Sequence, residues 1–242
     1  DELRTRSFTQ HTATIAQVVK DAKPQLLYRP KIVVMGREVG QPRDVAFFSD
    51  ASTGYLYSNR IMEAQPLSDA MRDLLKVLNA AYDVQFNGLL INCYRDGKDS
   101  VGAHGDSEKG LDTHAGVVIL SWGVSRKFRL RRNRGGTPMI MDVPTKHGHA
   151  LQMHGARFQS ELLHEIPKEL RVHGERVSIT ARKHLPQYEA LLARQRAREA
   201  ARARVCFDEV RERERVFFLK YVHGQGCACV CQVTPLVLPC FL

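Results

Sequence analysis

Long apolar segments are missing from this 242-residue sequence, and we expect no signal peptide in it. A helix that crosses a bilayer needs about 20 consecutive apolar residues, so we expect no membrane span and no membrane partner. Aromatic residues are few, at 7% of the chain with a single tryptophan, but 43% of the residues are hydrophobic. That fraction is enough for the core of one large β domain or of two small ones.

A disulfide framework is also lacking, although the chain has six cysteines. Cys93 lies alone in an apolar run and Cys206 in a charged stretch. The others crowd the end of the chain as Cys227, Cys229, Cys231 and Cys240. The C-x-C-x-C spacing of Cys227, Cys229 and Cys231 differs from the C-x-x-C spacing of common zinc knuckles. A large domain with one isolated cysteine indicates a reduced, intracellular protein that is not secreted.

Acidic residues are in deficit, because 26 Asp and Glu stand against 36 Lys and Arg, for a net charge of +10. The isoelectric point is about 9.5. A basic balance of this size favours an anionic partner, with nucleic acid ahead of an acidic membrane surface. The alternative is a basic protein without such a partner.

The pattern of short runs and turns predicts mostly strands. Residues 1–25 are polar and mixed, so we expect a loose lead-in or a short helix there. Ser68 can cap a helix whose apolar residues recur at helical spacing. Strand-like runs separated by turn-rich loops cover 88–94, 116–122, 127–132, 150–153 and 175–183. This order predicts a mostly β, α+β protein with flanking helices, built as an antiparallel sandwich or barrel.

Composition changes after Pro186. Residues 186–215 are rich in Ala, Arg, Glu and Leu and predict one long charged helix. Because glutamates accompany the arginines, a solvated helix face is favoured over a nucleic-acid arm. Residues 216–242 are expected to be an irregular, Cys-rich tail.

The tripeptide His104-Gly105-Asp106 is the strongest chemical signal in the chain. A histidine and a carboxylate two residues apart lie on one face of an extended segment. With a second histidine they would form a two-histidine, one-carboxylate triad, which leaves positions open on Fe(II). We favour His164 as that ligand from its spacing to a later arginine-rich strand. Other histidines lie near these residues, namely His114, His147, His149, His154 and His173.

The run from Arg176 to Arg182 alternates polar and apolar residues. Period-two alternation places Arg176, Ser178, Thr180 and Arg182 on one face of a strand. If that face lines a barrel, two buried arginines need an anion, and a dicarboxylate suits the guanidinium geometry. If the face is solvated, no ligand follows. Two further polar residues that share a face of an earlier strand could hold the same ligand, Asn92 and Tyr94.

In this order and spacing, the motifs of the segment from about Val33 to Lys183 resemble the AlkB-type Fe(II)/2-oxoglutarate dioxygenases, most of all the branch that repairs alkylated bases in duplex DNA. The resemblance implies a double-stranded β-helix, or jelly roll, with an N-terminal nucleotide-recognition lid. The implied domain covers 26–185, with the lid over about 31–60 and the jelly roll over about 86–185.

The resemblance also assigns roles residue by residue. The iron ligands would be His104, Asp106 and His164. The 2-oxoglutarate contacts would be Asn92, Tyr94, Arg176, Ser178, Thr180 and Arg182. At position 178 the family commonly has asparagine, whose side chain is longer than that of serine. The substrate contacts would be Met35, Arg43, Tyr55, Tyr57 and Glu108, with Met35 as a wedge inserted into the duplex.

The activity implied by the resemblance is oxidative demethylation of bases such as 1-methyladenine and 3-methylcytosine in DNA. The reaction would need bound Fe(II). It would consume 2-oxoglutarate and O2 and release succinate, CO2 and formaldehyde. The base must leave the stack to react, which an aromatic lid and a wedge explain. The alternatives are an RNA or single-strand demethylase, and an inactive nucleic-acid-binding module. We expect a nuclear monomer that binds double-stranded DNA, with RNA as the other candidate.

Overall fold

The computed structural model describes residues 2–34, 36–58, 60–106, 110–133, 139–155 and 158–224. The chain divides into two compact units, Asp1–Arg196 and Ala197–Leu242. Within the described residues, no helix is long and apolar enough to cross a membrane.

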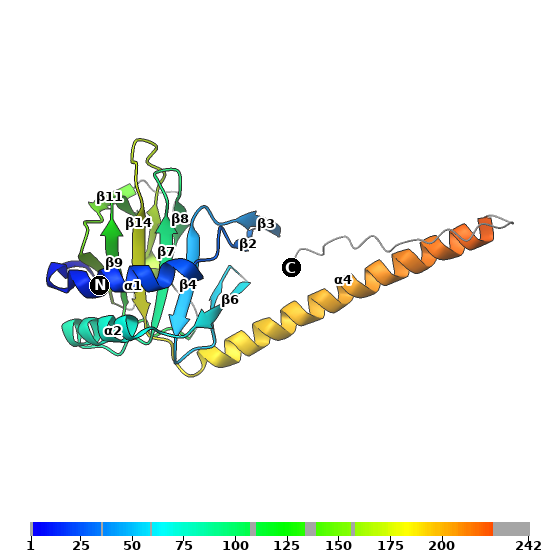
Figure 1. The fold of residues 1–242 in the computed structure, drawn as a ribbon, viewed down its shortest axis with the longest axis horizontal. Coiled ribbons are helices and arrows are strands. Elements are labelled where there is room, and N and C mark those ends of the chain that lie inside the picture. Colours follow the sequence, from blue (N-terminus) through cyan, green and yellow to red (C-terminus); the bar gives the residue numbers. More distant parts are fainter. Residues whose placement is uncertain are drawn as a thin grey trace. The chain divides into compact units, whose positions relative to one another are not determined.

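The first unit is built mainly of strands (Figure 1). The α-helices are α1 (Thr12–Ala22), α2 (Asp69–Tyr82), α3 (Phe158–Glu161) and α4 (Tyr188–Gly224), with 3-10 turns at Thr9–His11 and Lys23–Gln25. The strands before α2 are β1 (Glu2–Ser7), β2 (Lys31–Val34), β3 (Arg37–Gly40), β4 (Asp44–Ser49), β5 (Gly54–Tyr57) and β6 (Arg60–Gln65). The later strands are β7 (Gly88–Tyr94), β8 (Val101–His104), β9 (Val117–Gly123), β10 (Lys127–Arg132), β11 (Met139–Pro144), β12 (His149–His154), β13 (Leu162–Ile166) and β14 (Arg176–Arg182).

In the described part of the chain, the strands form a large sheet, a small sheet and a hairpin. The eight-stranded sheet has the order β1-β12-β9-β14-β7-β4-β6-β5, and the four-stranded sheet has the order β11-β10-β13-β8. The hairpin is β2-β3. Most pairs are antiparallel, with β4 and β6 parallel. The expected mostly β fold with flanking helices is confirmed.

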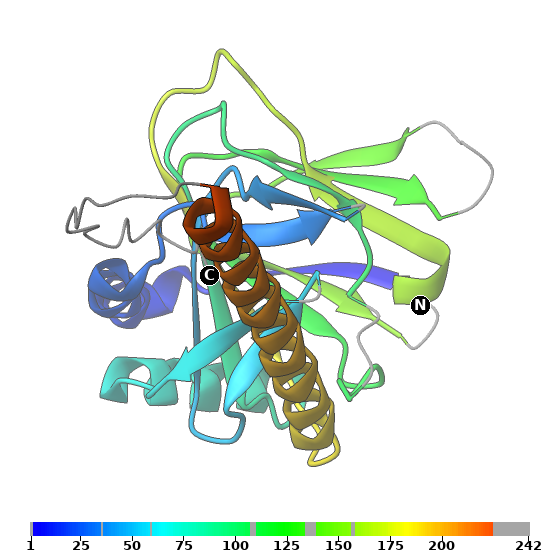
Figure 2. The ribbon, with the colours of Figure 1, turned by 90° about the vertical axis from the view of Figure 1, so that its right-hand side faces the viewer.

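Two apolar cores cover the two faces of the large sheet. On the outer face, α1 and α2 pack Ile15, Met71 and Leu74 against strand residues such as Ile91 and Ile179. Figure 2 shows these helices on one side of the sheet, opposite β10 and β11. The inner core lies between the two sheets, and its residues include Tyr94, Ile119, Phe128, Leu130, Met153 and Ile166.

Local sequence explains the helix that packs on this sheet. The Ser68 hydroxyl accepts a hydrogen bond from the Met71 amide at 3.3 Å, which caps α2 as the sequence predicts. The helix ends at Tyr82, and the capping residue Asp83 adopts a left-handed backbone conformation at φ 52°. Its apolar face is buried and its polar face is exposed.

The structure bears on the expectations for both chain ends. Of the two alternatives for residues 1–25, the short helix is present as α1 and joins the outer core, and the segment is not a loose lead-in because β1 also pairs along its whole length with β12. The charged helix was expected to end at 215 and be followed by an irregular tail, but α4 continues to Gly224. The tail cysteines Cys227, Cys229, Cys231 and Cys240 lie outside the described residues.

Candidate active site

The first two candidate ligands come from the end of one strand in the small sheet. His104 is the last residue of β8, and Asp106 follows two residues later in the loop. The intervening Gly105 is required by close packing, since a Cβ there would meet the Gln159 carbonyl oxygen at 2.7 Å. The Gln159 side chain also fixes this loop, because its Oε1 accepts from the Asp106 amide at 2.8 Å.

The third candidate ligand, His164, is brought to this loop by strand pairing. His164 of β13 lies directly opposite His104 of β8. One nitrogen or oxygen from each of His104, Asp106 and His164 lies within 4.8 Å of the others. Among the described residues, this is the group of His, Cys, Asp and Glu side chains that could hold a metal ion. The structure thus brings His164, and none of its rivals, to the pair.

The orientation of these side chains suits a metal. His104 Nε2 lies 3.8 Å from Asp106 Oδ1, and His164 Nε2 lies 3.9 Å from Asp106 Oδ2. His104 Nδ1 is 2.8 Å from the Gly102 carbonyl oxygen, an arrangement that leaves Nε2 for a metal. Asp106 Oδ2 is buried without a hydrogen-bond partner among the described residues. The two-histidine, one-carboxylate donor set fits Fe(II).

Electrostatics keep the three groups in the protonation states that metal ligands need. Burial lowers the pKa of His164 to about 3, so the ring is neutral at pH 7. Burial also lowers the pKa of His104, against the opposing effect of Asp106. Burial alone would raise the pKa of Asp106, but the Arg182 guanidinium at 2.8 Å holds it well below its usual range.

The polar face of β14 does not face water. All seven residues of the strand are buried, so the alternative of a solvated face is wrong. Val177, Ile179 and Ala181 belong to the outer core. The four polar residues line one pocket with the candidate ligands, together with Asn92 and Tyr94 of the adjacent β7. The pocket holds about 590 Å³ of empty space, including its mouth.

Arg176 is the clearest anion-binding group of the pocket. Its side chain is 1% exposed and its guanidinium lies 5.3 Å from the centre of the Tyr94 ring. Nη2 donates to Ser121 Oγ at 2.9 Å, but Nε and Nη1 are buried without partners among the described residues. A buried cation with free donors fits a carboxylate ligand such as that of 2-oxoglutarate.

The substrate residues that the structure describes lie at the same pocket. Tyr57 of β5 meets the His104 ring edge-on at 6.1 Å between ring centres, and it stacks on Tyr55 at 6.4 Å. Arg43 lies over the Tyr57 ring at 5.7 Å, and its Nε donates to Asn92 Oδ1 at 2.8 Å. Met35 and Glu108 lie outside the described residues.

Several residues of the site escape sequence reasoning. Ser121 orients Arg176, and Gln159 holds the loop of Asp106. Phe128 stacks on the His164 ring at 5.3 Å between centres and closes one wall of the pocket. Phe128 could have been placed from the alternation of its predicted strand. No local signal marks Ser121 or Gln159, because long-range strand pairing and packing bring them to the site.

The sequence of this chain is similar to those of known proteins. The chain matches the 2OG-Fe(II) oxygenase superfamily over residues 7–182. It is 29% identical to human DNA oxidative demethylase ALKBH2 over 161 residues, which are 64% of this chain and 61% of that protein. It is 33% identical to human alpha-ketoglutarate-dependent dioxygenase alkB homolog 3 over 154 residues, or 60% of this chain and 53% of that protein. The matched region is therefore less than two thirds of each relative.

A solved structure described as the structure of OsALKBH1 shares the fold. Its TM-score is 0.50 at 16% sequence identity, with 75% of this chain and 97% of that chain covered. At this identity the match supports the jelly-roll architecture and nothing further.

Proposed function

Because this chain belongs to the 2OG-Fe(II) oxygenase superfamily, we propose that it removes N-alkyl groups from damaged bases of DNA, such as 1-methyladenine and 3-methylcytosine. Its relatives confirm the resemblance to AlkB-type dioxygenases and the dependence of the family on Fe(II), 2-oxoglutarate and O2. Bound together, these three supply oxidation of the N-alkyl carbon, with succinate, CO2, formaldehyde and the restored base as products.

One observation carries the choice of substrate, namely an aromatic pair beside the candidate metal ligands. Tyr55 and Tyr57 have nearly parallel rings, 13° apart, and Tyr57 touches His104. A base that leaves the duplex can stack on such a ring with its alkyl group toward the metal. Arg43, which lies over the Tyr57 ring and lines the pocket, adds positive charge to its wall.

The roles of the pocket residues follow from their chemistry. His104, Asp106 and His164 would hold the iron. Arg176 would bind a carboxylate of 2-oxoglutarate, with Asn92, Tyr94, Ser178 and Thr180 around the remainder. Arg182 pairs with Asp106 at 2.8 Å and would orient that ligand as well as the cosubstrate.

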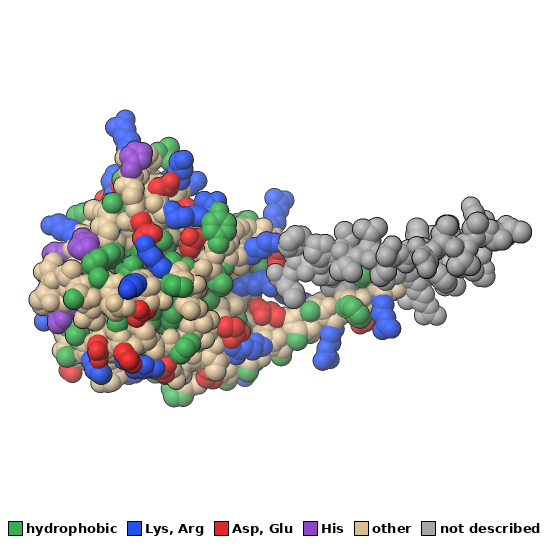
Figure 3. Space-filling view, viewed as in Figure 1, with side chains coloured by type: hydrophobic (Ala, Val, Ile, Leu, Met, Phe, Trp, Pro, Cys, Tyr) green, Lys and Arg blue, Asp and Glu red, His purple; other side chains and the backbone are tan. Residues whose placement is uncertain are grey.

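We favour duplex DNA because the β2–β3 hairpin of the lid offers a second contact beside the tyrosine pair. Lys31 and Arg37 are exposed on this hairpin, and Figure 3 shows basic side chains there. The proposed wedge, Met35, lies between these two strands in the sequence. The 168–171 loop favours the alternative of a single-stranded substrate. Its Glu169 accepts from Arg126 at 3.1 Å, so this residue supports the loop and adds no positive charge.

The test compares turnover of 1-methyladenine in matched duplex DNA, single-stranded DNA and RNA. Formaldehyde release and loss of the methyl group are measured together with Fe(II) and 2-oxoglutarate present. The proposal predicts the highest kcat/KM on duplex DNA. Faster action on RNA would overturn the choice of DNA, and faster action on single strands would overturn the choice of duplex.

A further inference from the structure

The hairpin that carries Tyr55 and Tyr57 has few backbone pairs with the rest of the large sheet, although Tyr55 packs with Val45, Phe47 and Leu90. β5 and β6 form its arms at the sheet edge, and β6 pairs with β4 at two positions. These positions, Phe47 opposite Ala64 and Phe48 opposite Gln65, lie near the end of β6. An edge hairpin with so few backbone pairs depends on side-chain contacts to stay in place.

The first turn of α4 supplies a set of hydrogen bonds to the turn before β5. Glu189 Oε1 accepts from the Ser52 hydroxyl and from the Thr53 amide, each at 2.9 Å. Glu189 Oε2 accepts from the Thr53 hydroxyl at 2.6 Å. Burial would raise the pKa of Glu189, but these donors lower it below its usual value. The carboxylate is thus fixed as an anion against the base of the hairpin.

The residue before it reaches the middle of β5. Tyr188 is fully buried, and its hydroxyl oxygen accepts from the Leu56 amide at 2.9 Å, between the two pocket tyrosines. Its ring stacks on His184 with 4.9 Å between centres. The His184 ring in turn lies 6.3 Å from the ring of Tyr55. A chain of three rings therefore connects α4 to the pocket wall.

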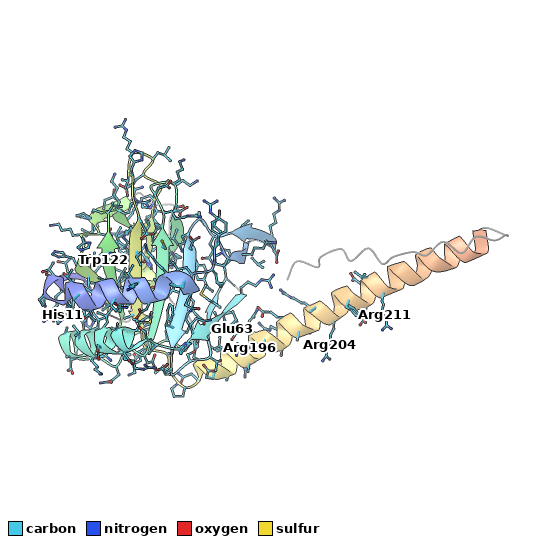
Figure 4. The ribbon with its side chains drawn as sticks, in the orientation of Figure 1. His11, Glu63, Trp122, Arg196, Arg204 and Arg211 are labelled. Atoms are coloured by element: carbon cyan, nitrogen blue, oxygen red, sulfur yellow. The ribbon has the colours of Figure 1, made fainter. Side chains whose placement is uncertain are left out.

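Arg196, two turns further along α4, joins both arms of the hairpin. Its guanidinium donates to the Thr53 hydroxyl at 3.0 Å and to the Thr53 carbonyl at 3.2 Å. It also pairs with Glu63 of β6 at 2.6 Å, and Figure 4 shows the two side chains together. A guanidinium can make these contacts at once because its donors form a rigid fork.

From these contacts we propose that Tyr188, Glu189 and Arg196 position the Tyr55–Tyr57 hairpin and thereby set the affinity of the pocket for its nucleic-acid substrate. The inference rests on the proposed function for the identity of that substrate. These three are positioning residues, because they contact the hairpin and line no part of the pocket. The start of the charged helix then supports the substrate site from outside the pocket.

The experiment compares Glu189→Ala, Arg196→Ala and Tyr188→Phe with two control variants on the exposed part of α4, Glu209→Ala and Arg204→Ala. Arg204 is exposed and has no hydrogen-bond or ion-pair partner within the part of the chain that the structure describes. Tyr188→Phe removes the hydroxyl and keeps the ring, so it serves if a larger truncation prevents folding.

We expect the KM for a methylated oligonucleotide to rise in the three test variants, with the KM for 2-oxoglutarate unchanged. Hydrogen bonds to a charged group are strong enough that their loss in Glu189→Ala should raise the KM for the oligonucleotide about tenfold. The controls should match the parent in both constants. Equal changes in both KM values, or no change in either, would overturn the proposal.

Hydrogen–deuterium exchange separates this inference from the proposed function. Amides of residues 54–65 should exchange about tenfold faster in Glu189→Ala and Arg196→Ala than in the controls. This result does not require turnover of any oligonucleotide. If the parent repairs no methylated nucleic acid, the proposed function fails, while unchanged exchange in 54–65 refutes the positioning role itself.

Discussion

Arg176 offers the sharpest prediction, because it is a buried cation with unused donors. Burial lowers its pKa from the ordinary 12.5 to about 10, with partial opposition from Tyr94. At about 1.36 kcal/mol for each pKa unit, this difference costs the folded protein about 3 kcal/mol. The group is still charged at pH 7, so the cost is present under ordinary conditions.

Replacing this residue in Arg176→Met removes the cost and also the hydrogen bond to Ser121, which contributes about 1 kcal/mol. The variant without 2-oxoglutarate should therefore be more stable than the parent by about 2 kcal/mol. In a domain of this size each kcal/mol raises Tm by roughly 2–4 °C.

Binding of 2-oxoglutarate should weaken in the same variant. Two charge-assisted hydrogen bonds to a carboxylate contribute about 3–6 kcal/mol, so the Kd should rise by about two to four orders of magnitude. Thermal unfolding is followed with and without 2-oxoglutarate for the parent, Arg176→Met and the exposed control Arg132→Met. An Arg176→Met protein that melts lower than the parent and is still stabilised by 2-oxoglutarate would refute the reasoning.

Three further substitutions test the site and its support. Burial lowers the pKa of His184 to about 3, so below pH 6.5 the unfolded chain takes up a proton that the folded chain does not, and stability falls. In urea titrations, His184→Leu should reduce this loss of unfolding free energy by about 1.36 kcal/mol per pH unit between pH 6 and 4. An unchanged slope of unfolding free energy against pH would contradict this prediction. Ser68→Ala removes the cap of α2 and should cost about 1 kcal/mol of unfolding free energy, while an unchanged Tm would argue against the cap. Gly105→Ala places a Cβ 2.7 Å from the Gln159 carbonyl, so Fe(II) affinity measured by titration should fall about tenfold. Parent-like affinity would show that this loop can shift without loss.

Local patterns in the sequence were sufficient for two central strands of the pocket, β14 and β7. The alternation from Arg176 to Arg182 placed four polar residues on one face, and β14 has those bounds. The run from Gly88 to Tyr94 likewise matches β7. Both are central strands whose side chains pack on two sides, so the period of two is imposed by burial.

Other elements depend on contacts that no local pattern encodes. β1 is almost wholly exposed and is held by backbone pairing with β12, so its residues show no apolar alternation. Spacing favoured His164, but its approach to His104 results from the pairing of β13 with β8. The buried start of α4 was hidden by the Arg and Glu residues that dominate the helix, although Tyr188 and Leu192 are fully buried.

The central claim is that His104, Asp106 and His164 form the iron centre of a base dealkylase. The most direct test is mass spectrometry of a duplex containing 1-methyladenine after incubation with Fe(II), ascorbate and 2-oxoglutarate. We predict loss of the methyl group by the parent, with one succinate for each formaldehyde, and none of these products from Asp106→Ala. A parent protein that leaves the methyl group in place, or an Asp106→Ala protein that removes it at the parental rate, would contradict the account.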